Sequence, residues 1–105
     1  MLRELTADEF QSTTTENMRL LGEDDQTCAG FPLVSYVEQW IGIMGMAMDV
    51  DDFEFHYAYM NDENRMCHVG LNFGDPNLYL VIVLDVSGGV IVGHTILDVS
   101  RRKHR

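Results

Sequence analysis

The sequence predicts an α+β fold, in which two N-terminal helices pack on one face of a four-stranded antiparallel meander sheet. Three observations lead to this prediction. The chain has 105 residues, the size of one domain. Its first half carries helix signals, and its second half carries four stretches that alternate with a period of two. Helices followed by a run of strands are typical of α+β domains.

A capping box formed by Thr6 and Glu9 predicts the start of the first helix. The Ser/Thr-rich run that follows is poor helix material, so we expect either one irregular helix over residues 7–21 or two short ones. Gly22 is a suitable helix stop. The polar residues 23–30 show no periodicity and are expected to form a surface loop.

Apolar residues recur with a helical period over residues 33–48, directly after Pro32. Proline is favoured at the first helical position, which supports a helix start there. The helix is apolar on most sides, so we expect it to be buried, with Trp40 in the core. Gly42 and Gly45 should each lower helix stability by roughly 1 kcal/mol relative to Ala.

Four predicted strands follow, separated by turn-forming segments. The first covers residues 53–59, where aromatic residues at odd positions predict one aromatic face. The second covers 65–73. The third, 78–86, is apolar on both faces, as is typical of a central strand, and the fourth covers 90–99. Since two helices cover one face, the second face must meet the N-terminal segment, a second subunit or a partner.

The charge of the chain is strongly unbalanced. Seventeen acidic residues oppose seven basic ones, and four of the seven lie within residues 101–105. We therefore divide the chain into a single domain, residues 1–100, with three basic residues and a net charge of −14, and a basic C-terminal tail, residues 101–105. Such an acidic body repels phosphates and anionic lipid, which argues against nucleic-acid and membrane binding. It favours a basic protein partner.

Two widely spaced cysteines, Cys28 and Cys67, form neither a disulfide framework nor a paired-cysteine metal motif. The N-terminus lacks the apolar core of a signal peptide. The most apolar stretch, residues 31–48, is too polar and slightly too short for a membrane span. These features predict a cytoplasmic protein with reduced, buried thiols.

Acidic residues gather in two predicted connections, and both are candidate partner-binding segments. The candidate residues are Glu23, Asp24, Asp25, Asp49, Asp51, Asp52 and Glu54. The second segment is similar to half of a calcium loop, but it lacks the Gly and the closing Glu of an EF-hand, so we expect no metal there. Tyr57 and Tyr59 are candidate anchors if they are exposed.

The histidines offer an alternative site. His56 and His68 are expected on the same face of the first hairpin, where Glu54 would flank them. Two imidazoles and a carboxylate could bind zinc or serve acid–base catalysis. No clustered metal-ligand motif accompanies them, however. His94 lies among apolar neighbours and is expected to be a core histidine with one hydrogen bond.

The sequence contains no nucleophile elbow, phosphate-binding loop or dinucleotide fingerprint, so we expect neither an enzyme nor a cofactor. In size, acidity and lack of catalytic motifs the chain resembles bacterial immunity proteins and antitoxins that neutralise nuclease toxins. The resemblance implies an inhibitor whose carboxylates occupy the place of substrate phosphates in a basic active site. The alternatives are the histidine site and a structural homodimer that associates through its apolar sheet face.

Overall fold

A computed structural model of the chain describes residues 3–14, 16, 18–22, 27–28, 30–72 and 74–98. Its helices are α1 (Ala7–Ser12), α2 (Leu33–Met44) and the short 3₁₀ helix η2 (Val50–Asp52). Its strands are β1 (Arg19–Leu20), β2 (Thr27–Cys28), β3 (Phe31–Pro32), β4 (Glu54–Asn61), β5 (Met66–Asn72), β6 (Leu78–Asp85) and β7 (Val90–Asp98). The α+β class is confirmed. The predicted tail, residues 101–105, and the domain boundary at residue 100 lie outside the described residues.

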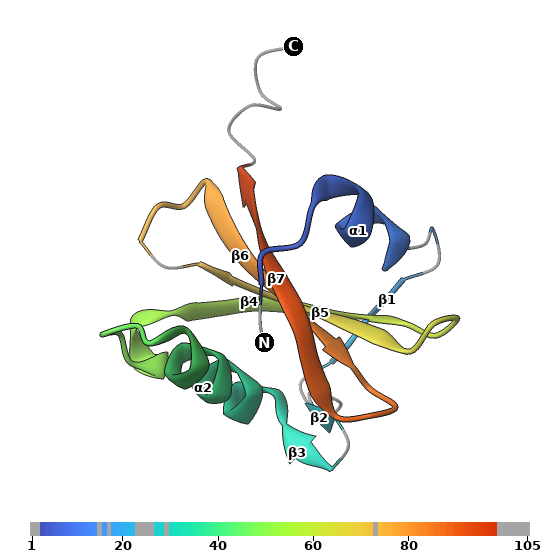
Figure 1. Cartoon of the computed structure of the whole chain (residues 1–105), viewed down its shortest axis with the longest axis horizontal. Helices are drawn as coiled ribbons and strands as arrows, with labels where there is room; N and C mark the ends of the chain where they lie inside the picture. Colours follow the sequence, from blue (N-terminus) through green and yellow to red (C-terminus); the bar gives the residue numbers. More distant parts are fainter. Residues whose placement is uncertain are drawn as a thin grey trace.

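The main sheet has five strands in the order β1-β4-β5-β6-β7, all antiparallel (Figure 1). The predicted meander is present as β4 to β7, and its bounds agree with the predicted strands within a few residues. The predicted number of strands, four, was wrong. Arg19 and Leu20 pair with Met60 and Tyr59, and this pairing adds β1 at the edge of the sheet. A separate two-stranded ladder, β2-β3, precedes α2.

Helix α1 begins where the capping box predicts. The Thr6 hydroxyl accepts from the Glu9 amide, and the Glu9 carboxylate accepts from the Thr6 amide. The helix ends at Ser12 rather than near residue 21. Thr13 terminates it, since its hydroxyl donates to the Phe10 carbonyl at 2.7 Å, a local bond that competes with helix continuation. The chain beyond it supplies β1.

Helix α2 begins after Pro32, as predicted, but it ends at Met44 rather than at residue 48. Gly45 adopts a left-handed conformation with φ of 69°, a common way for a helix to end because glycine has no Cβ to clash. Trp40 is 4% exposed, which confirms its place in the core. One face of α2 packs on one face of the sheet, called here the inner face, in a cluster that includes Leu33, Val37, Trp40, Ile41, Cys67, Val69, Leu71, Leu80, Ile82 and Leu84.

The two helices lie on opposite faces of the sheet, so the prediction that they share one face was wrong. The Phe10 ring of α1 stacks on His68 with centroids 4.8 Å apart. His68 belongs to the face opposite its neighbour Cys67, which we call the outer face. Val81 and Val83 also belong to the outer face and are fully buried. The N-terminal segment covers this part of the apolar second face.

The N-terminal segment also extends along the β7 edge. The Leu5 amide donates to the His94 carbonyl at 2.7 Å, and the His94 amide donates to the Arg3 carbonyl at 3.2 Å. The approach is so close that a Cβ on Gly93 would lie 2.7 Å from the Arg3 carbonyl oxygen. Glycine is therefore required at position 93, where the N-terminal segment passes β7. The segment also covers part of β7, which is an edge strand of the sheet.

Strand β4 contains an irregularity that changes which side chains share a face. Its register with β5 shifts between Phe55 and Tyr57, so His56 occupies a β-bulge. Phe55 therefore packs towards the inner-face core, whereas Tyr57 and Tyr59 lie on the outer face with His68. The prediction of one continuous aromatic face was wrong for this reason.

Candidate functional site

The candidate site is the acidic connection between α2 and β4, formed by Asp49, Asp51, Asp52 and Glu54. All four residues are exposed. Glu23, Asp24 and Asp25, the other predicted partner-binding residues, lie outside the described residues. The structure thus places one of the two predicted acidic segments.

Local hydrogen bonds shape the acidic connection. The Asp49 amide donates to Oδ2 of Asp52 at 2.8 Å, and the Asp52 amide donates to the Asp49 carbonyl at 3.0 Å. The Phe53 amide closes the turn on the Val50 carbonyl at 3.2 Å. Asp52 therefore stabilises η2 as well as contributing charge, and these bonds fix the backbone that presents the acidic side chains.

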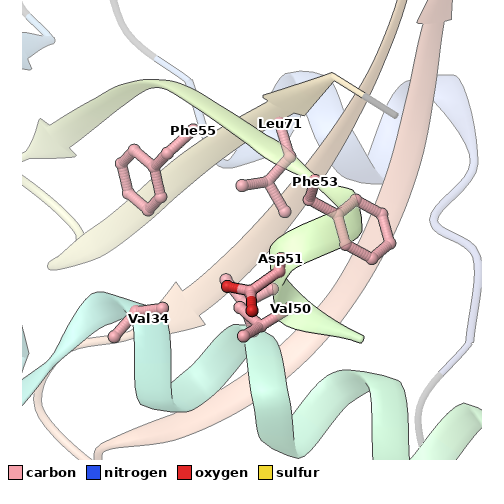
Figure 2. A pocket seen from close by; sticks show the side chains of 7 residues that line it. Val34, Val50, Asp51, Phe53, Phe55 and Leu71 are labelled. Atoms are coloured by element: carbon pink, nitrogen blue, oxygen red, sulfur yellow. The ribbon is translucent and has the colours of Figure 1, made fainter. Parts of the chain in front are cut away.

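The acidic connection borders an apolar pocket of about 250 Å³ between α2 and the sheet. Figure 2 shows the Asp51 side chain between α2 and the sheet residues that form the opposite wall. The lining residues are Val34, Val37, Val50, Asp51, Phe53, Phe55 and Leu71. Ligand pockets for small molecules usually exceed about 300 Å³, so this one is closer in size to a single side chain.

The described basic residues engage carboxylates elsewhere. Arg3 pairs with Glu9, and Arg19 and Arg65 both pair with Asp62, at 3.1 and 3.8 Å. Within the part of the chain that the structure describes, the ion pairs include none at Asp49, Asp51 or Asp52. Asp49, Asp51 and Asp52 therefore present charge that the described basic residues do not neutralise.

The structure does not assemble the alternative site at Glu54, His56 and His68. The Nε2 atom of His56 lies 3.1 Å from Oε1 of Glu54, but β4 pairs Tyr59, not His56, with His68. His68 is buried, and its Nε2 contacts the Thr13 hydroxyl at 2.8 Å. Among the described residues, no three His, Cys, Asp or Glu side chains gather closely enough to hold a metal ion.

Burial keeps His68 neutral. It lowers the pKa of the imidazole from 6.5 to about 4, against a smaller opposing effect of the Thr13 backbone. Because the Thr13 hydroxyl already donates its hydrogen to Phe10, Nε2–H of His68 is the donor in their contact. The neutral His68 side chain thus holds α1 on the outer face through its contacts with Thr13 and Phe10.

His94 is the core histidine that the sequence predicts. It is buried, and its Nδ1 accepts from the Trp40 indole N–H at 3.2 Å. Burial also lowers the pKa of His94. The bond links α2 to β7 and satisfies a buried indole that would otherwise be costly.

The sequence did not reveal one group of side chains on the outer face. Tyr57, Tyr59 and Tyr79 lie together, half-buried, with Tyr57 over Gly70. Two of these tyrosines were candidate anchors, but the part played by Tyr79 and Gly70 was missed. A glycine inside a strand can signal close approach of another group, and that signal was available at Gly70.

The chain matches no family model, no curated protein and no solved structure with which it was compared. None of the described helices is long and apolar enough to cross a membrane.

Proposed function

We propose that the chain is a small acidic inhibitor that binds a basic protein through the connection formed by Asp49, Asp51, Asp52 and Glu54. The observation that carries the proposal is a group of exposed carboxylates of which one, Asp51, lines an apolar pocket. A Lys or Arg side chain suits this combination, because its aliphatic stem can pack against the apolar walls of the pocket while its charged end meets Asp51.

The net charge of −10 supports the same partner class. A surplus of one sign accelerates encounter with a protein of the opposite sign and disfavours partners of the same sign. Carboxylates held on a short, hydrogen-bonded turn offer fixed negative charge of the kind that a basic active site meets in phosphates. We propose a nuclease-like toxin as the partner, with inhibition by occupation of its substrate groove.

The proposal is tested by identifying and inhibiting the partner. Tagged chain is used to capture proteins from the cells that encode it, beside a variant that carries Asp49→Lys and Asp51→Lys. Asp52 is left in place because its carboxylate accepts the Asp49 amide. A protein captured by the wild type and lost with the variant is then purified and assayed for cleavage of RNA and DNA with increasing amounts of the chain.

We expect stoichiometric loss of nuclease activity with the wild type and little with the variant. A control variant carries Glu16→Lys and Glu63→Lys, which changes the net charge equally at two exposed positions away from the site. Equal loss of inhibition in both variants would attribute binding to overall charge and contradict the assignment of the site. An acidic partner, or one without nuclease activity, would contradict the proposed function.

A further inference from the structure

The N-terminal segment leaves a cluster of tyrosines accessible on the outer face. We call Tyr57, Tyr59 and Tyr79 the tyrosine face. The ring of Tyr57 lies 5.2 Å from that of Tyr59 and 6.1 Å from that of Tyr79, centroid to centroid. All three residues are half-buried. They are thus packed firmly enough to hold their positions while keeping part of each residue accessible.

Gly70 makes this arrangement possible. Tyr57 pairs with Gly70 across β4 and β5, and a Cβ on Gly70 would lie 2.2 Å from Cζ of Tyr57. The absence of a side chain lets the Tyr57 ring lie across β5 towards Tyr79 on β6. The aromatic cluster therefore extends from β4 across β5 to β6.

A carboxylate stands beside the tyrosine face. The His56 ring meets Tyr79 edge-on, with centroids 5.1 Å apart, and its Nε2 lies 3.1 Å from Oε1 of Glu54. The Glu54 side chain is 78% exposed, so its carboxylate remains available to a partner.

Burial raises the pKa of Tyr57, which keeps its phenol uncharged.

We propose that the tyrosine face and Glu54 bind the guanidinium group of arginine side chains on a basic protein partner. The planar guanidinium stacks on aromatic rings and donates hydrogen bonds to a carboxylate in a way that an ammonium group does not match. Nucleobases also stack on such rings, but their phosphates would be repelled by a chain with net charge −10. The inference rests on the proposed function in taking the partner to be basic.

The tyrosine face is tested without a protein partner. The probe is N-acetyl-arginine amide, and its neutral isostere, N-acetyl-citrulline amide, is the control. Ring resonances of the four tyrosines are followed by NMR as each probe is added. Tyr36 is an internal control, because it is buried in the inner-face core. We expect saturable shifts at Tyr57, Tyr59 and Tyr79 with the arginine probe, and none at Tyr36.

Two variants test the residues. Tyr79→Leu and Glu54→Gln should each weaken binding about two- to five-fold, the loss expected for one exposed cation–π or charged contact. Glu54→Gln alters an exposed side chain and keeps the fold testable if Tyr79→Leu is unstable. The probe assay contains no protein partner, so saturable shifts at the three tyrosines would support the inference even if the proposed inhibition fails. Equal shifts with both probes, or unchanged binding by both variants, would overturn it.

Discussion

Acidification should loosen the docking of α1 on the sheet because His68 must remain neutral there. Burial lowers its pKa from 6.5 to about 4. As the pH falls from 6.5 towards 4, the imidazole of His68 is therefore protonated in the unfolded chain but stays neutral in the folded chain. The stability linked to neutral His68 is fully present above pH 6.5 and is lost progressively as the pH falls towards 4.

The size of the effect follows from the same pKa values. Between pH 6.5 and pH 5 the unfolded imidazole is protonated and the folded one is not, and each pH unit in that interval contributes about 1.4 kcal/mol. The free energy of unfolding should thus fall by about 2 kcal/mol from pH 7 to pH 5 through His68 alone. His94, whose pKa is also lowered by burial, adds a loss of the same sign.

Urea unfolding followed by Trp40 fluorescence at pH 5, 6 and 7 measures this loss. A His68→Gln variant retains a side-chain donor towards Thr13 but does not titrate, so the wild type should lose about 2 kcal/mol more than the variant over this range. Subtracting the two profiles removes the contributions of His94 and of the carboxylates. Parallel profiles for wild type and variant would refute the account of His68.

Three further predictions concern the core, the tyrosine face and the tail. Trp40 should emit at a blue-shifted wavelength in the native state, and a water-like emission maximum would contradict its packing in the core. Trp40→Phe should lower the free energy of unfolding by about 1–3 kcal/mol, because Nδ1 of His94 loses its hydrogen-bond donor. Gly70→Ala should displace the Tyr57 ring and cost about 1–3 kcal/mol, and the same change in a Tyr57→Ala background should cost much less. If Gly70→Ala lowered the free energy of unfolding equally in both backgrounds, Gly70 and Tyr57 would not be in contact. Deletion of residues 101–105, which follow the last apolar position, should leave the melting temperature nearly unchanged, whereas a large drop would mean that the tail contributes to the fold.

The fold class, the start of α1 and the meander were predictable because each depends on local patterns. Thr6 and Glu9 satisfy backbone groups within one turn, and turn-forming segments separate the apolar stretches that form β4 to β7. The additional strand β1 was not predictable, since its two residues gain their conformation from pairing with Met60 and Tyr59 rather than from propensity.

The candidate site was predictable in charge but not in shape. Clustered Asp residues before a strand are visible in the sequence, whereas the pocket beside Asp51 depends on how α2 ends at Gly45 and returns through η2. The bulge at His56 left little trace in the alternation, yet it turned Tyr57 away from Phe55 and placed it near Tyr79. Tertiary packing decided both features.

Charge complementarity at the acidic connection is the central claim, and the association rate with the purified partner tests it most directly. The rate is measured from about 50 mM to about 500 mM salt, over which the screening length contracts from roughly 14 Å to about 4 Å. We expect a steep fall with salt, and a rate at low salt at least about tenfold lower for Asp49→Lys with Asp51→Lys than for the control pair Glu16→Lys with Glu63→Lys. A rate that ignores both salt and the reversal at Asp49 and Asp51 would contradict the claim.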